Sequence, residues 1–108
     1  MNFTVEDKNK NKIIRCNNDR LDSIVSPELK SHFLHLSKSG NNHIILDLSK
    51  VIYCDSSGLS ALLVGNRLAN ENDGKFTIFG LRPSVEKIIS ISQLDTVLNI
   101  ASDEDNAF

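Results

Sequence analysis

The spacing of apolar residues alternates along the chain between a period typical of strands and one typical of helices. Strand-like apolar runs, bounded by polar or glycine-containing turns, occupy residues 3–6, 12–16, 43–48, 75–79 and 96–100. Between the runs, apolar residues at helical spacing predict helices that begin near Ser26, Ser57 and Pro83. Strands that alternate with helices need crossover connections, which predicts a largely parallel sheet. We therefore expect one α/β domain, whose small mixed sheet packs against helices mainly on one face.

The first predicted helix has clear start and stop signals. Ser26 is the expected N-cap, Pro27 takes the first helical position, and Gly40 is expected to end the helix. Its buried face is expected to consist of the apolar residues at helical spacing, Leu29, Phe33 and Leu36.

The second predicted helix begins after four small or polar residues, Asp55-Ser56-Ser57-Gly58, that separate two apolar runs. One interpretation is an ordinary N-cap, because Asp and Ser side chains accept hydrogen bonds from free helix amides. The other is a phosphorylation switch. Gly58 lets another backbone come close and removes side-chain cover from Ser57, and a phosphate on Ser57 would meet the positive end of the helix. Spacing alone leaves both interpretations open.

Several stretches of the chain resemble a known family. Leu-Asp-Leu-Ser-Lys-Val at 46–51 and Tyr-Cys-Asp-Ser-Ser-Gly-Leu at 53–59 resemble the signature of STAS domains, and more narrowly that of the anti-sigma factor antagonists. Further similarity lies in Arg-Leu-Asp at 20–22, Ser-Pro-Glu-Leu-Lys at 26–30, Gly-Leu-Arg-Pro-Ser-Val at 80–85, and Leu94, Asp95 and Val97. The resemblance covers about residues 3–100.

The resemblance implies a protein–protein switch in transcriptional control. In that family a partner anti-sigma kinase phosphorylates the second serine of the motif, which is Ser57 here, and Asp55 and Ser56 frame it. The unphosphorylated domain would bind an ATP-dependent serine kinase that also holds a sigma factor, and so release the sigma factor. Phosphorylation would break that complex, and a serine phosphatase would restore it. Asp22 and Gly58 join the expected partner-binding residues, and the domain itself needs no cofactor.

Two positions depart from the family pattern. Asp19 precedes Arg20 where many members have glycine, and Ser60 takes a place that glycine often holds. Neither change removes the phosphoacceptor, but both leave the identity of the partner open.

The second predicted helix carries two apolar sides. Ala61, Gly65 and Ala69 lie four residues apart and form a narrow strip that would let the helix lie close to the sheet. Leu59 and Leu63 fall on a different side. That side is either a second part of the core or a surface that contacts the partner.

Composition and charge narrow the function classes. The chain has 108 residues and a formal net charge of −2, which suits one domain and gives no support for nucleic-acid binding. Its apolar runs are too short to span a bilayer and its first residues do not resemble a signal peptide, so we expect no membrane partner and a cytoplasmic location. Residues 101–108 are expected to form a frayed acidic tail on a single domain of residues 1–108.

The cysteines and carboxylates give no sign of a catalytic site. Cys16 and Cys54 each end an apolar run and are expected to be buried, reduced thiols, with a disulfide or metal role as the alternative. Asp22, Asp47 and Asp55 are not placed by the pattern beside a nucleophile and a histidine base, so we do not expect an enzyme.

The function expected from the sequence is that of an anti-sigma factor antagonist, as a monomer or weak dimer. The alternative is a scaffold or adaptor subunit with the same fold, in a stress-signalling assembly or a lipid-transport complex. A fold alone does not decide between them. The retained Asp55-Ser56-Ser57-Gly58 motif favours the antagonist.

Overall fold

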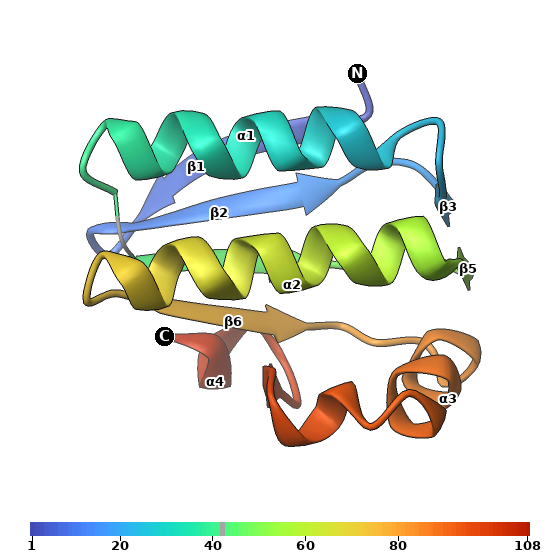
Figure 1. The fold of residues 1–108 in the computed structure, drawn as a ribbon. Helices are drawn as coiled ribbons and strands as arrows, with labels where there is room; N and C mark the ends of the chain where they lie inside the picture. Colours follow the sequence, from blue (N-terminus) through green and yellow to red (C-terminus); the bar gives the residue numbers. More distant parts are fainter. Residues whose placement is uncertain (42) are drawn as a thin grey trace.

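The computed structural model describes residues 1–41 and 43–108. Its strands are β1 (Phe3–Lys8), β2 (Asn11–Cys16), β3 (Arg20–Leu21), β4 (His43–Asp47), β5 (Tyr53–Cys54), β6 (Lys75–Phe79) and β7 (Asn99–Ala101). Its helices are α1 (Ser26–Lys38), α2 (Ser56–Glu71), α3 (Pro83–Ile91), the short 3₁₀ helix η1 (Leu94–Thr96) and α4 (Glu104–Ala107). The predicted alternation of strands and helices is confirmed, and β3, β5, η1 and α4 are additions to it (Figure 1).

The main sheet of the described residues has the strand order β1-β2-β4-β6-β7. β1 runs antiparallel to β2, while β2, β4, β6 and β7 run parallel to one another. The prediction of a mixed, mostly parallel sheet is therefore confirmed. β3 and β5 pair with each other as a separate parallel ladder, in which Leu21 lies opposite Cys54.

A tight hairpin turn joins β1 to β2. Asn9 and Lys10 have φ angles of 52° and 66°, both in the left-handed region. Two such residues in succession match the right-handed twist of the flanking strands, as in type I′ turns. The turn therefore fixes the register that places Lys8 opposite Asn11.

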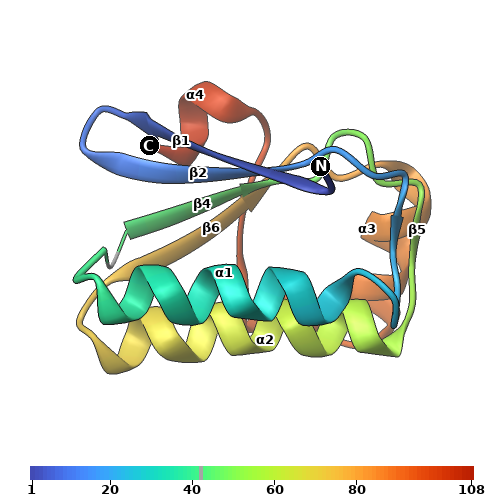
Figure 2. The same cartoon turned by 90° about the horizontal axis from the view of Figure 1, so that it is seen from above.

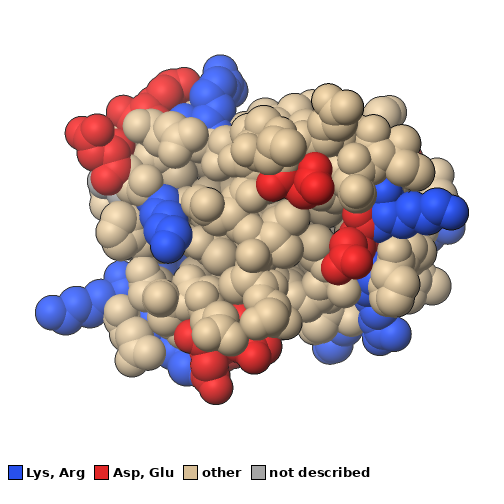
Figure 3. All heavy atoms as spheres, turned by 90° about the horizontal axis from the view of Figure 1, so that it is seen from below, with Lys and Arg blue, Asp and Glu red and all other residues tan. Residues whose placement is uncertain are grey.

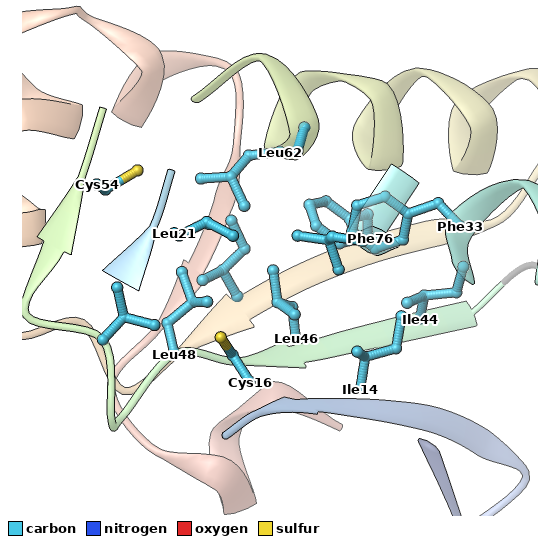
Figure 4. Close-up of a cluster of buried hydrophobic side chains, with 14 of the residues drawn as sticks. Ile14, Cys16, Leu21, Phe33, Ile44, Leu46, Leu48, Cys54, Leu62 and Phe76 are labelled. Atoms are coloured by element: carbon cyan, nitrogen blue, oxygen red, sulfur yellow. The ribbon is translucent and has the colours of Figure 1, made fainter. Parts of the chain in front are cut away.

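Helices α1 and α2 lie side by side over one face of the sheet (Figures 1 and 2). The core between the layers is apolar (Figure 4). Leu29, Phe33 and Leu36 form the buried face of α1 as predicted. The Phe33 ring meets the Phe76 ring of β6 edge to face, with centroids 5.3 Å apart. Gly65 of α2 is close-packed against the same Phe33, since a Cβ on Gly65 would lie 2.9 Å from two of its ring carbons. Gly65, the middle residue of the small-residue strip on α2, thus serves the contact with α1.

The opposite face of the sheet is covered in part by α4, so the prediction of a frayed tail is wrong. Ala107 is buried against Ile13 and Ile45. Glu104 forms ion pairs with Lys8 at 2.7 Å and with Arg15 at 2.9 Å. These contacts come from strands at the other end of the chain, which is why the local sequence did not reveal them.

The predicted N-cap of α1 is also wrong. Val25 takes the N-cap position without a side-chain hydrogen bond, and Ser26 is the first helical residue. Asp22 accepts hydrogen bonds from the amides of Ile24 and Val25 at 3.0 and 3.4 Å, so the polar turn forms before the helix. The Ser26 hydroxyl is buried and has no hydrogen-bond partner among the described residues.

Both cysteines are buried free thiols, as predicted. The exposed fractions of Cys16 and Cys54 are 2% and 5%. Burial raises the pKa of both thiols, that of Cys54 to about 12. Because the thiolate is the reactive species, both residues fill core space and are poorly reactive in the folded protein.

Candidate functional site

The candidate site is built where the ladder of β3 and β5 ends. Leu21 and Cys54 are register partners, so the residues that follow them, Asp22 and Asp55, leave the ladder at the same end. The Asp55 amide donates a hydrogen bond to the Leu21 carbonyl at 3.3 Å. The loop into α1 and the start of α2 are thereby fixed beside each other.

Asp55 caps α2. Its backbone is extended, and its Oδ1 accepts a hydrogen bond from the Gly58 amide at 3.1 Å. This geometry confirms the helix start expected from the motif, with the helix beginning at Ser56. A capped helix end still presents free amides and a positive partial charge in its first turn.

The two serines lie in that first turn and differ in exposure. Ser56 is exposed and Ser57 is half-buried. Among the described residues, neither hydroxyl makes a hydrogen bond. Ser57 is therefore at the surface, with its hydroxyl available, and is not enclosed within a strand.

Gly58 is required by close packing. A Cβ at this position would lie 2.4 Å from the Leu21 carbonyl oxygen and 2.6 Å from the Cys54 Sγ. The expected close approach of another backbone is confirmed. The second expected role, to uncover Ser57, does not match the structure, because the space that a side chain would need lies toward Leu21 and Cys54. Gly58 is buried, so the accessible surface here belongs to its neighbours.

Asp22 is held by a network on the neighbouring loop. Its carboxylate accepts hydrogen bonds from the amides of Ile24 and Val25. It also accepts a hydrogen bond from Arg20 Nε, at 3.2 Å. Burial opposes ionisation of this carboxyl, but the hydrogen bonds from the two amides and from Arg20 outweigh it, and the pKa of Asp22 lies below its ordinary value. Asp22 therefore carries a fixed negative charge on the loop beside the start of α2.

The structure adds residues to this surface that the sequence pattern did not indicate. The Arg20 guanidinium lies over the Tyr53 ring, 4.2 Å from its centroid. Ile24 is 84% exposed and Ile52 is 52% exposed. Ile24 lies in the loop before α1, where no apolar periodicity marked it. Exposed aromatic, arginine and aliphatic side chains of this kind are common at the centres of protein interfaces.

Leu59 and Leu63, predicted to share one side of α2, have different environments. Leu59 is partly buried and packs against the core. Leu63 is 38% exposed and lines a shallow groove with Ser60 and Arg67. The two interpretations of this side therefore apply to different residues: Leu59 belongs to the core, and Leu63 remains a candidate contact.

The described residues show neither a metal-binding cluster nor a membrane-spanning element. No group of three or more His, Cys, Asp or Glu side chains is arranged to hold a metal ion in residues 1–41 and 43–108. Over the same residues, every helix is too short or too polar to cross a bilayer.

The fold and the site together define a small α/β domain that presents a hydroxyl at a capped helix start, beside a loop with a fixed carboxylate. The chain belongs to the STAS domain family, whose model matches residues 2–107.

Proteins similar to this chain in sequence are named for a narrower class than the STAS family. The anti-sigma F factor antagonist of Paenibacillus polymyxa is 32% identical over 65 residues, which cover 60% of this chain and 56% of that protein. The match thus spans about half the length of this relative. The anti-sigma-B factor antagonist of Staphylococcus aureus is 25% identical, over 93% of this chain and 94% of that protein.

Solved structures share the fold. An anti-sigma factor antagonist from Mycobacterium paratuberculosis superposes with a TM-score of 0.86 and 21% identity, covering 97% of this chain and 88% of that one. The antagonist SpoIIAA in its unphosphorylated form gives a TM-score of 0.80 and 22% identity, covering 95% of this chain and 90% of that one. SpoIIAA, a Bacillus cell-fate determinant, has also been solved in a phosphorylated form, which gives a TM-score of 0.73 and 21% identity over 95% of this chain and 94% of that one.

Proposed function

We propose that this protein is an anti-sigma factor antagonist whose binding to an anti-sigma serine kinase is switched by phosphorylation of Ser57. The names of its relatives support the antagonist role, and a structural neighbour that exists in phosphorylated and unphosphorylated forms supports a switch. The observation that carries the proposal is the position of Ser57, half-buried in the first turn of α2, with its hydroxyl unpartnered among the described residues.

The unphosphorylated domain has a surface suited to a protein partner. Ile24 and Tyr53 expose apolar area in the segments that precede α1 and α2, Leu63 does so midway along α2, and Arg20 is pre-ordered by its stacking on Tyr53. An ordered arginine over an aromatic ring loses little side-chain freedom on binding, which favours affinity. A kinase that binds here, in the cytoplasm, would release the sigma factor that it holds.

Phosphorylation would change the charge of this surface without a local cation to neutralise it. A phosphoserine carries about −1.5 to −2 charges at neutral pH. The free amides of α2 would stabilise the phosphate on the isolated domain. Arg20, however, is already engaged by Asp22 and Tyr53, and Asp55 adds a second carboxylate. The partner would have to desolvate an unpaired negative charge, so the complex would dissociate until a serine phosphatase removed the phosphate.

The test is phosphorylation by the cognate anti-sigma kinase with ATP, followed by mass spectrometry. We expect one phosphate, on Ser57. Ser57→Ala should bind the kinase and resist inactivation, whereas Ser57→Asp should bind poorly. An unpaired charge desolvated at an interface costs roughly 2–5 kcal/mol. At about 1.4 kcal/mol per decade, the affinity should fall more than tenfold.

Ser56→Ala is the matched control, because Ser56 lies in the same turn and is more exposed. It should still be phosphorylated. A phosphate on Ser56, or equal kinase binding by Ser57→Asp and the wild type, would contradict the switch. Stable binding of a partner regardless of phosphorylation would favour the scaffold role.

A further inference from the structure

We propose that a hollow at the end of the sheet remote from Ser57 binds a small organic phosphate, an ester that carries an apolar group beside its phosphate. We call it the lysine hollow. Its lining includes Lys10, His43, Ile45, Lys75, Thr77 and Phe108. This proposal is independent of the switch at Ser57, because the hollow shares no residue with that site.

Two lysines and a histidine converge on the lysine hollow. His43 and Lys75 are register partners at the start of β4 and β6, and Lys10 comes from the turn between β1 and β2. Side chains of register partners project from the same face of a sheet. In residues 1–41 and 43–108, neither Lys10 nor Lys75 forms an ion pair. Two lysines without carboxylate partners attract anions.

The nearby acidic helix does not neutralise these cations. Glu104 of α4 is held by Lys8 and Arg15 at 2.7 and 2.9 Å. In Figure 3, the left end of the face, which carries the β1–β2 turn in Figure 1, shows Lys and Arg side chains together with Asp and Glu side chains. Within the described residues, none of these carboxylates forms an ion pair with Lys10 or Lys75.

The hydroxyl of a largely buried residue, Thr77, supplies a second and separate indication of a ligand in the lysine hollow. Thr77 is only 5% exposed and lies opposite Ile45 in the pairing of β4 with β6. Within the part of the chain that the structure describes, the Thr77 hydroxyl makes no hydrogen bond. The hydroxyl oxygen still has access to solvent, so it can donate a hydrogen bond to a ligand in the hollow that Thr77 lines. A phosphate oxygen in the lysine hollow would accept that hydrogen bond.

The remaining lining explains why the ligand should also have an apolar part. Ile45 and Ala107 are buried residues of the small apolar cluster beneath α4, and Phe108 lies at its edge. The Phe108 ring is already approached by Lys8, whose Nζ lies 5.3 Å from the centroid. A mostly apolar hollow with a few convergent polar groups is typical of small-molecule sites. Inorganic phosphate alone would leave this apolar surface unused.

The test is an NMR titration of the ¹⁵N-labelled full chain with phenyl phosphate, compared with inorganic phosphate and with phenol. We expect saturable shifts centred on β4, β6 and the β1–β2 turn, with tighter binding of phenyl phosphate than of either fragment. Lys75→Gln should weaken binding about threefold, the effect of one partly exposed charge pair. Thr77→Val, which keeps the side-chain shape, should weaken it by a similar factor. Lys87→Gln, on α3, is the control and should bind like the wild type.

Three results would overturn the proposal. The first is unchanged affinity in both Lys75→Gln and Thr77→Val. The second is a set of shifts spread over lysines throughout the surface, or binding of phenol as tight as that of phenyl phosphate. The third is binding to vesicles containing phosphatidylglycerol, dependent on Lys75, without binding of phenyl phosphate, because the phosphate recognised would then be a lipid headgroup.

Discussion

Helices α1 and α2 lie side by side on the same face of the sheet, and both begin at a serine, but the two serines have opposite environments. At α1 the Ser26 hydroxyl is buried without a partner among the described residues, and no side chain caps the helix. At α2, Asp55 caps the helix directly, and Ser56 and Ser57 remain accessible. The conformation of the preceding residue makes the difference: Val25 is already helical, whereas Asp55 is extended. Ser57 is thus accessible at a helix start that Asp55 caps, whereas Ser26 is buried at a helix start that no side chain caps.

The first prediction concerns the glycine that allows this start. Gly58→Ala should destabilise the domain by about 2–3 kcal/mol, the upper part of the range for overpacking. The added Cβ would meet the Leu21 carbonyl at 2.4 Å, and backbone in a strand ladder has little freedom to move away. Urea denaturation measures the change.

Gly65→Ala is the matched control on the same helix. The three atoms nearest to its Cβ would all belong to the Phe33 ring, the first at 2.9 Å, and a side chain yields more easily than backbone. The higher helix propensity of Ala, worth about 1 kcal/mol, offsets part of the strain. Gly58→Ala should therefore be clearly less stable than Gly65→Ala, and equal stabilities would show that the close approach to Leu21 is not rigid.

The second prediction compares the exposed leucines of the two helices. Leu63→Glu, midway along α2, should weaken kinase binding by about tenfold, equivalent to roughly 1.4 kcal/mol, while leaving the fold intact. Leu34→Glu on α1 introduces the same charge at a similar exposure, 45% against 38%, and should leave binding unchanged. Surface plasmon resonance with the kinase, supported by circular dichroism, separates binding from folding. Equal losses in both variants would point to a general charge effect, and unfolding of Leu63→Glu would assign that residue to the core.

The candidate site was predictable where local chemistry decides the structure. The cap at Asp55 and the surface position of Ser57 follow from residues within one helical turn of each other. The exposure of Ile24 and the stacking of Arg20 on Tyr53 could not be predicted, because both depend on how β3 and β5 pair across the chain. Two-residue strands carry too little periodicity to be recognised.

The fold, like the site, was predictable only where local sequence decides the structure. The five strands of the main sheet and the apolar face of α1 follow from periodicity, whereas α4 depends on contacts between distant residues. Arg15 and Glu104, which hold it, are 89 residues apart in sequence. Composition alone made the terminal segment look like a solvated tail, because an acidic run has no local sign of the arginine that binds it.

The third prediction returns to the serine of α1. Ser26→Ala should stabilise the domain by about 0.5–1 kcal/mol, because it removes a buried hydroxyl without a hydrogen bond among the described residues and improves helix propensity. The matching change on α2, Ser57→Ala, should alter the free energy of unfolding by less than about 0.5 kcal/mol, as expected for an accessible residue whose role is not in stability. Urea denaturation of both variants tests the contrast. A loss of stability in Ser26→Ala would show that its hydroxyl has a partner after all, and the two helix starts would then differ less than their geometry indicates.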